Sequence, residues 1–145
     1  MKSSERNVSL TEQSRVELRY AVLVVDEDAA DLAHYSALLQ AEGYDVRATT
    51  SYIQALGWLG SQRFDFIIVS QGSRKFDGRA VLERAVEIDR RVPVLVLARS
   101  VDMGCYIEAM HLGALDYFEK PMMPREFLRL VNSHLPAGTQ LRRAA

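Results

Sequence analysis

Five short segments with the pattern of strands, most of them apolar and one alternating between apolar and polar residues, are each followed by a segment with helical periodicity. This alternation restricts the fold of the chain more than any other feature. The apolar segments are too short for ordinary helices and most are rich in valine, isoleucine and leucine, which favours buried strands. The alternation predicts an α/β fold: a five-stranded parallel sheet, doubly wound in the flavodoxin-like order, with right-handed crossovers. The strands are predicted at residues 20–25, 44–48, 64–69, 93–97 and 115–118, and the helices at 29–42, 51–60, 78–90, 101–112 and 124–135.

The length of 145 residues suits one domain and leaves no room for a second. We assign this domain to residues 20–135, between a polar N-terminal tail, 1–19, and a C-terminal tail, 136–145. Ser9 and Glu12 have the spacing of a helix capping box, so the N-terminal tail is compatible with either a short helix or a loose segment.

Charge and cysteine content argue against several classes of partner. The chain has 18 lysines and arginines against 19 acidic residues, so it has no basic field for binding nucleic acid directly. No apolar run approaches the roughly 20 residues of a membrane helix, and the first residues lack a signal-peptide core. Cys105 is the single cysteine and cannot form an internal disulfide, which suits a reducing compartment. We therefore expect a cytoplasmic protein that binds neither DNA nor a membrane.

Polar residues follow three of the predicted strands at the point where each strand ends. Asp26 and Glu27 follow the first strand, Ser70 the third, and Lys120 and Pro121 the fifth. The carboxyl ends of parallel strands meet at one edge of the sheet, where sites form in open α/β folds. The sequence therefore predicts a shared pocket at this edge.

Several motifs, in this order along the chain, resemble the receiver domain of bacterial response regulators, the CheY-like family. The resemblance covers about residues 20–135 and implies a module of a two-component or phosphorelay signal transduction system. The motifs are Val-Val-Asp-Glu-Asp at 24–28, Phe-Asp-Phe-Ile-Ile-Val at 64–69, Phe-Asp-Gly at 76–78, Pro-Val-Leu-Val-Leu at 93–97, Leu-Gly-Ala-Leu-Asp-Tyr-Phe at 112–118, and Lys-Pro at 120–121.

The resemblance also implies roles for individual residues. In this family an acidic pair and an aspartate after the third strand bind magnesium, and that aspartate accepts a phosphoryl group from a kinase histidine. Carried over to this chain, the acidic pair is Asp26 and Glu27, and the lysine that holds the phosphate is Lys120, with Pro121 behind it. Tyr117 takes the position of the switch aromatic.

Two positions depart from the family pattern, and both concern its chemistry. Ser70 occupies the acceptor position, and Ala98 occupies the position of a hydroxyl residue after the fourth strand. A serine hydroxyl needs a base to become a nucleophile, and none of these motifs contains a histidine. Magnesium prefers charged oxygen ligands, so with one carboxylate lost we expect only weak binding by Asp26 and Glu27. We expect no catalytic residue, no enzyme activity and no bound cofactor.

The loss of one carboxylate also changes the charge balance of the pocket. Two carboxylates about 5 Å apart repel by roughly 3 kcal/mol at an effective dielectric constant of 20. With Ser70 in place of an acid, Lys120 is available to neutralise Asp26. We therefore expect a Lys120–Asp26 ion pair that holds the pocket in one state.

Methionines and aromatic residues gather between residues 101 and 123. Core packing accounts for some of them, but such side chains are also frequent at protein-binding surfaces. In the resembling family, partners and second subunits dock on the face formed by the fourth helix, the fifth strand and the last helix. The candidate surface residues here are Met103, Tyr106, Met110, Tyr117 and Met122.

These observations favour a pseudo-receiver, which binds a protein partner or a second copy of the chain without aspartyl phosphorylation. The alternative is a working phosphorelay receiver with a non-standard acceptor such as Asp26 or Ser70. A small-molecule phosphatase or esterase ranks below both, because Ser70 lacks a Gly-x-Ser-x-Gly turn and a paired base. A flavin-binding domain ranks last, because the acidic first βα loop would repel a phosphate.

Overall fold

The computed structural model describes residues 19–135 of the chain. The two tails expected from the sequence, 1–19 and 136–145, lie outside the described residues apart from Arg19, and so does the capping-box sequence at Ser9.

Strands and helices alternate throughout the described chain, as predicted. The sheet order is β2-β1-β3-β4-β5, and every neighbouring pair of strands is parallel, which is the flavodoxin-like order. The strands are β1 (Ala21–Val25), β2 (Asp45–Thr49), β3 (Phe66–Ser70), β4 (Val94–Ala98) and β5 (Asp116–Glu119). The helices are α2 (Ala29–Ala41), α3 (Tyr52–Ser61), α4 (Arg79–Ile88), α5 (Met103–Leu112) and α6 (Pro124–His134).

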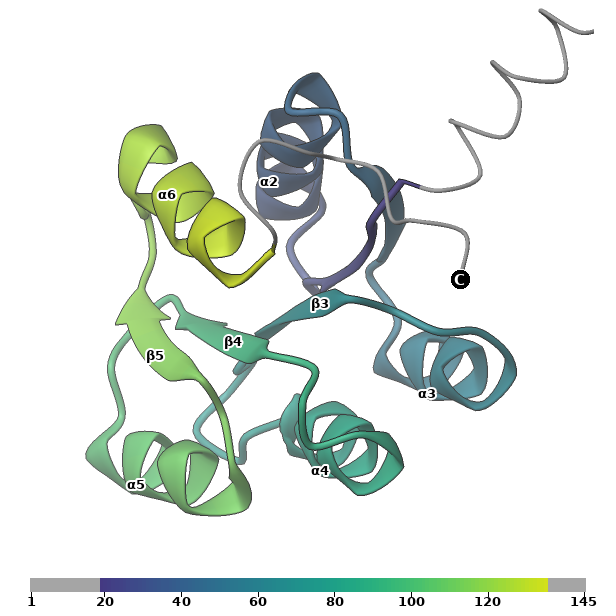
Figure 1. The fold of residues 1–145 in the computed structure, drawn as a ribbon. Helices are drawn as coiled ribbons and strands as arrows, with labels where there is room; N and C mark the ends of the chain where they lie inside the picture. Colours follow the sequence, from purple (N-terminus) through teal and green to yellow (C-terminus); the bar gives the residue numbers. More distant parts are fainter. Residues whose placement is uncertain (1–18, 136–145) are drawn as a thin grey trace, which may run out of the picture.

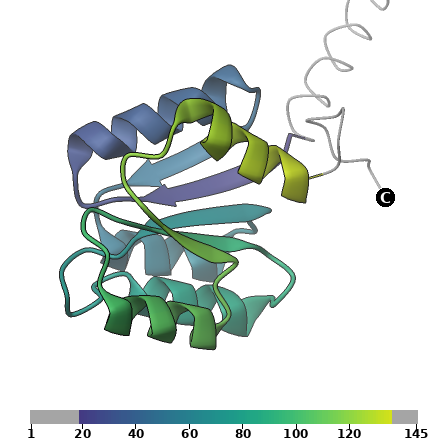
Figure 2. The same ribbon diagram turned by 90° about the vertical axis from the view of Figure 1, so that its left-hand side faces the viewer.

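Helices cover both faces of the sheet. α2 and α6 lie on one face, and α3, α4 and α5 lie on the other (Figure 1). Figure 2 shows the sheet between these two helical layers. Because all five strands are parallel, their carboxyl ends lie at one edge, and the loops after β1, β3, β4 and β5 can together form a site there.

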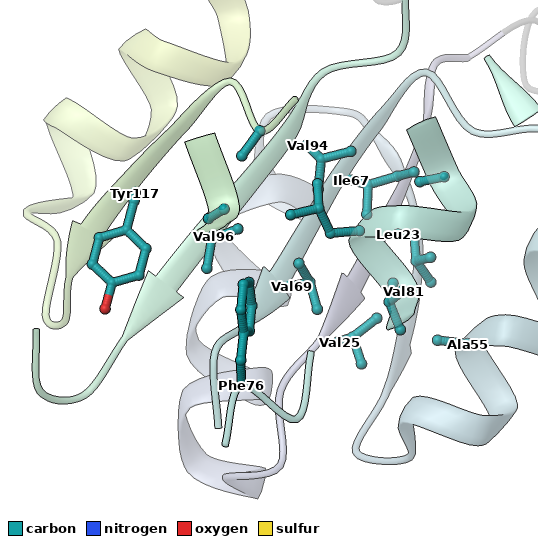
Figure 3. Packing of buried hydrophobic residues seen from close by; sticks show 14 of the residues in the cluster. Leu23, Val25, Ala55, Ile67, Val69, Phe76, Val81, Val94, Val96 and Tyr117 are labelled. Carbon is teal, nitrogen blue, oxygen red and sulfur yellow. The ribbon is translucent and has the colours of Figure 1, made fainter. Parts of the chain in front are cut away.

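The core consists of two apolar clusters, one on each face of the sheet. The side chains of alternate residues along a strand point to opposite faces, so each strand contributes to both clusters. Every residue of β3 and β4 is buried, which explains their nearly continuous apolar sequence. The cluster under α3, α4 and α5 includes Leu23, Val25, Ile67, Val69, Val96 and Tyr117 (Figure 3). The cluster under α2 and α6 includes Val22, Val24, Tyr35, Phe66, Ile68 and Phe127.

Polar side chains fix where three helices begin. Asp28 caps α2 and Ser51 caps α3, each by accepting hydrogen bonds from backbone N–H groups of the first turn. Asp102 caps α5, since its carboxylate accepts from the N–H of Cys105 at 2.9 Å. As a result α5 begins at Met103, two residues later than predicted.

β3 is displaced toward the carboxyl end relative to the predicted strand at 64–69. Asp65 accepts a hydrogen bond from the N–H of Ala21 at 2.7 Å and belongs to the loop before the strand. At the other end, Ser70 still pairs with Leu97 in the ladder. Side-chain alternation places Ser70 on the same face as Ile68, toward α2 and α6.

Candidate functional site

Lys120 lies at the centre of an ionic cluster at the carboxyl edge of the sheet. Its Nζ is 2.9 Å from Oδ2 of Asp26, after β1, and 2.9 Å from Oδ2 of Asp31, in the first turn of α2. The side chains of Lys120 and Asp26 are only 5% and 3% exposed. The ion pair expected between these two residues is therefore present. Asp31 is a further partner that sequence reasoning did not find.

The cluster contains more negative than positive charge. Burial raises the pKa of Asp26, and the hydrogen bond from Lys120 offsets this only in part. Burial also disfavours the charged form of Lys120, yet hydrogen bonds to two carboxylates outweigh it and raise the pKa of the ammonium group. The two pKa values rise for different reasons: burial raises that of Asp26, with a smaller contribution from the negative charge of Glu27, whereas the two carboxylates raise that of Lys120.

Asp28 and Arg99 join the loops on either side of the end of β3. Arg99 follows β4, and its Nη2 is 2.7 Å from Oδ2 of Asp28. The N–H of Asp28 donates to Oδ1 of Asp26 at 3.0 Å, so the capping residue of α2 also orients the buried carboxylate. Because β3 lies between β1 and β4 in the sheet, the Arg99–Asp28 pair crosses the edge where β3 ends.

Glu27 is held by a tyrosine that sequence reasoning did not single out. The Tyr52 hydroxyl is 2.8 Å from Oε2 of Glu27 and 3.1 Å from the carbonyl oxygen of Ser70. Burial would raise the pKa of Glu27, but hydrogen bonding from Tyr52, aided by the nearby Ser70 hydroxyl, outweighs it and lowers the pKa. Burial and the Glu27 carboxylate raise the pKa of Tyr52, which therefore stays a proton donor.

Ser70 is enclosed at the end of β3. The residue is 1% exposed, and its Oγ makes no hydrogen bond of acceptable geometry to any of residues 19–135. Ala98, at the end of β4, is fully buried in the cluster on the other face of the sheet and carries no polar group. Neither the acceptor position nor the hydroxyl position thus presents a reactive group to solvent.

The loop from Gln71 to Gly78 packs against the end of β3. The N–H of Gly78 donates to the carbonyl oxygen of Gln71 at 3.1 Å. A Cβ atom at Gly78 would lie 2.2 Å from the carbonyl oxygen of Ser70, so no other residue fits without moving the backbone. Asp77 accepts from the N–H of Ser73 at 2.7 Å and closes the loop.

Tyr117 is buried and hydrogen-bonded on both sides. Its hydroxyl donates to the side-chain carbonyl of Gln71 and accepts from the N–H of Asp102 at 3.1 Å. Its ring makes an edge contact with Tyr106, with the ring centroids 5.5 Å apart. No sequence pattern pointed to the contacts of Asp31, Tyr52 or Gln71. Gln71 could be noted only because it directly follows the end of β3.

The structure divides the five residues proposed for a partner surface. Met103 and Tyr106 are exposed on α5, at 64% and 39%, and Met110 is half-buried against the core. Tyr117 is 7% exposed and Met122 is 6% exposed, so neither is part of the outer surface. Met122 packs with the cluster under α2 and α6. Sequence alone could not separate these residues, because the core and the surface use the same side-chain types here. Three exposed apolar residues nearby are not among the five candidates: Val101, Ile107 and Met123.

Comparison with known proteins identifies the family. The sequence profile of the response regulator receiver domain matches residues 22–132, which is most of the chain. The chain belongs to the response regulator receiver domain family. No helix among residues 19–135 is long and apolar enough to cross a membrane.

Individual relatives agree with this assignment. The transcriptional regulatory protein ZraR of Escherichia coli (strain K12) is 34% identical over 101 residues, 70% of this chain and 23% of ZraR. The DNA-binding response regulator MtrA of Mycobacterium leprae (strain TN) is 29% identical over 118 residues, 81% of this chain and 52% of MtrA. The chain thus spans about a quarter of the length of ZraR and about half of the length of MtrA. A CheY-like receiver domain from Methanospirillum hungatei JF-1 shares the fold, with a TM-score of 0.74, 22% identity, and coverage of 79% of this chain and 92% of that one.

The magnesium ion of receiver domains does not fit the pocket of this one. Asp26 is engaged by Lys120, Glu27 is engaged by Tyr52, and Ser70 contributes no charge. Within the described part of the chain, no three acidic, histidine or cysteine side chains are arranged to hold a metal ion. Magnesium would have to displace both contacts to gain two carboxylates, and it prefers near-ideal octahedral coordination.

Proposed function

We propose that this receiver domain is a pseudo-receiver, which acts in two-component signalling by binding a protein and not by accepting a phosphoryl group. The observation that carries the proposal is the state of Ser70: the residue is 1% exposed, its hydroxyl makes no hydrogen bond of acceptable geometry within residues 19–135, and it lies where the family has a carboxylate. An acyl phosphate cannot form on a hydroxyl, and activating serine as a nucleophile needs a general base. Ala98 removes the second polar group of the phosphate site.

The surrounding contacts support the same proposal. The ammonium group of Lys120 is paired with Asp26 and Asp31, so it is not available to bind a phosphate. Tyr52 uses the Glu27 carboxylate that would otherwise be available to a metal ion. These contacts give Asp26, Glu27 and Lys120 partners within the pocket, which supports a structural role for the pocket in the domain.

The alternative, a working receiver with a non-standard acceptor, requires Asp26 or Ser70 to meet a phosphodonor. Asp26 is 2% exposed and paired, and Ser70 is 1% exposed. An in-line attack needs an accessible nucleophile, and both residues would first have to be uncovered. The geometry therefore favours the pseudo-receiver.

The proposed binding surface is the face of α5 that carries Met103, Tyr106 and Ile107, which are 64%, 39% and 59% exposed. Tyr106 and Ile107 are three and four positions after Met103 on one helix, so the three side chains lie on the same face, and contiguous exposed apolar side chains are typical of protein-binding sites. With 18 basic and 19 acidic residues in the chain, we propose that the partner is a protein or a second copy of the domain, and not nucleic acid.

The test is a comparison of ¹H–¹⁵N spectra with and without magnesium and beryllofluoride, together with mass spectrometry after incubation with acetyl phosphate. We expect no saturable shift at Asp26, Ser70 or Lys120 and no added phosphate. The double variant Ser70→Asp/Ala98→Thr, which restores both missing groups, is the matched control. A saturable, magnesium-dependent response of the wild-type domain at these residues would overturn the proposal.

A further inference from the structure

Gln71 occupies an unusual place, because it directly follows Ser70 and yet its side chain points away from the ionic cluster toward β5. Its N–H donates to the carbonyl oxygen of Leu97 at 2.7 Å, and its own carbonyl oxygen accepts from Gly78 at 3.1 Å. The backbone of Gln71 is thus fixed to β4 on one side and to the start of α4 on the other. The residue is 2% exposed, so its amide is held in a defined position inside the protein.

The Gln71 amide determines where the Tyr117 hydroxyl can bond. That hydroxyl donates to the side-chain oxygen of Gln71 and accepts from the N–H of Asp102. No other side-chain oxygen among residues 19–135 accepts from Tyr117, and a buried hydroxyl without an acceptor costs about 1–3 kcal/mol. Gln71 therefore favours the buried position of the ring, which lies in the same layer as Val96 and Phe76 (Figure 3).

The Tyr117 ring in turn contacts the exposed face of α5. The rings of Tyr117 and Tyr106 meet edge to face, at an angle of 71°. Met103 and Ile107 flank Tyr106 one turn before it and one residue after it on the same helix, and both are exposed. Asp102, the second partner of the Tyr117 hydroxyl, is the cap that begins this helix. A continuous series of contacts thus leads from Gln71 to the surface of α5.

We propose that Gln71 is a positioning residue for the α5 surface: by accepting from Tyr117 it sets the place of Tyr106 and of the first turn of α5. The inference rests on the proposed function in one respect: it takes the exposed face of α5 to be the surface that binds the partner. It goes further by naming the residue that maintains the binding conformation without phosphorylation.

The experiment uses [¹³C-methyl]methionine spectra of the full chain, because the methionines report on both sides of the sheet. Met103 and Met110 lie on α5, and Met122 lies in the opposite core cluster as an internal control. In Gln71→Met, which keeps the length of the side chain but removes the acceptor, we expect the α5 methyl signals to shift and broaden while Met122 stays in place. Gln71→Glu retains a side-chain oxygen, and we expect its α5 signals to remain close to those of the wild type.

A double-mutant comparison tests whether Gln71 acts through Tyr117. In a Tyr117→Phe background, which lacks the hydroxyl, Gln71→Met is expected to cause no further shift at Met103. Three results overturn the inference: unchanged α5 signals in Gln71→Met, equal shifts at Met122 and Met103, or a full effect of Gln71→Met in the Tyr117→Phe background. If Gln71→Met does not fold, Tyr117→Phe is compared with Tyr117→Phe/Gln71→Glu. The inference is supported if the α5 methyl signals shift in Tyr117→Phe and the added Gln71→Glu change causes no further shift. Any other result overturns the inference.

This test needs no partner, so its failure is distinct from failure of the proposed function. A domain that responds to beryllofluoride overturns the pseudo-receiver proposal but leaves the contacts of Gln71 to be judged by the methyl spectra. Conversely, a domain whose α5 methyl signals do not change in Gln71→Met can still be a pseudo-receiver.

Discussion

The Tyr52 hydroxyl lies 2.8 Å from the Glu27 carboxylate and 3.1 Å from the Ser70 carbonyl oxygen, and so joins the start of α3 to the ends of β1 and β3. Glu27, one of the two residues of the acidic pair, is thereby hydrogen-bonded to Tyr52. This contact also lowers the pKa of Glu27, which is exposed to solvent, and so favours its ionised form. The domain thus keeps the carboxylate but uses it in an internal hydrogen bond.

Replacing Tyr52 with Phe removes this contact. A hydrogen bond to a charged group contributes roughly 1.5–3 kcal/mol, and partial exposure of Glu27 reduces this, so we expect a loss of about 1 kcal/mol in the free energy of unfolding. Urea denaturation measures the loss, and ¹³C titration is expected to show a higher pKa for Glu27. Tyr106→Phe is the control, because the Tyr106 hydroxyl has no hydrogen bond within residues 19–135. Equal losses in both variants would contradict this role.

The acid dependence of stability provides a second test of the same contact. The pKa of Glu27 in the folded state is below its ordinary value of 4.5, so its contribution is complete above that value and is lost as pH falls through the lower, folded pKa. Stability of the wild type is therefore expected to fall more steeply in acid than that of Glu27→Gln. Denaturation curves between neutral pH and acid compare the slopes, and identical slopes would refute the assignment.

The Lys120–Asp26 pair is expected to be costly to break. Lys120→Met leaves a buried, unpaired carboxylate, and breaking such pairs costs about 3–5 kcal/mol. Because Asp26 already has a raised pKa, the variant is expected to regain stability as pH falls and the acid becomes neutral.

The double variant Asp26→Asn/Lys120→Met is the control for this prediction. It removes both charges and is expected to be more stable than Lys120→Met alone at neutral pH. If the single and double variants unfold at the same urea concentration, the buried charge is not the source of the loss.

Ser70 offers a contrast between two substitutions. Ser70→Ala removes a buried hydroxyl that makes no hydrogen bond of acceptable geometry within residues 19–135, so we expect unchanged or slightly higher stability. Ser70→Asp adds a carboxylate near Asp26 and Glu27, and a pair of such charges about 5 Å apart repels by roughly 3 kcal/mol at an effective dielectric constant of 20. We therefore expect a lower melting temperature for Ser70→Asp, partly recovered in magnesium. A destabilised Ser70→Ala would show that the hydroxyl has a structural partner.

The last prediction concerns Gly78, which packs against the backbone of Ser70. Gly78→Ala places a Cβ atom 2.2 Å from the carbonyl oxygen of Ser70, and overpacking of this kind costs typically about 1–3 kcal/mol. Gly57→Ala, in the middle of α3 with no atom within 4 Å of the new Cβ, is the matched control. It is expected to stabilise the domain by about 0.5–1 kcal/mol. Thermal unfolding of both variants tests the contrast, which fails if Gly78→Ala is tolerated.

The fold and the ion pair could be predicted from the sequence because both depend on patterns that survive in it. Apolar strands alternate with helical periodicity, and Asp26 and Lys120 stand directly after strand ends. The contacts of Asp31, Tyr52 and Gln71 could not be predicted. Each depends on the distance between elements that are far apart in the sequence, such as the 46 residues that separate Gln71 from Tyr117.

The limits of strands and of the surface were less predictable for a related reason. The predicted strand begins at residue 64, whereas β3 begins at Phe66, and the side chain of Asp65 accepts a hydrogen bond from the N–H of Ala21. Whether a methionine belongs to the core or to the surface depends on the direction in which its side chain leaves the backbone: Met122 and Met123, which are adjacent, are 6% and 67% exposed. Residue type alone does not show which of two neighbouring methionines in a loop is buried.

The Arg99–Asp28 pair has a consequence for any attempt to restore signalling chemistry to this domain. It links the loops that flank the end of β3, so the guanidinium group of Arg99 is held at the edge of the sheet where position 70 lies. A guanidinium group can bind phosphate, but here it is paired with Asp28. In a reactivated domain the phosphoryl group and Asp28 would therefore compete for Arg99, and we expect added salt to weaken the exposed Arg99–Asp28 pair.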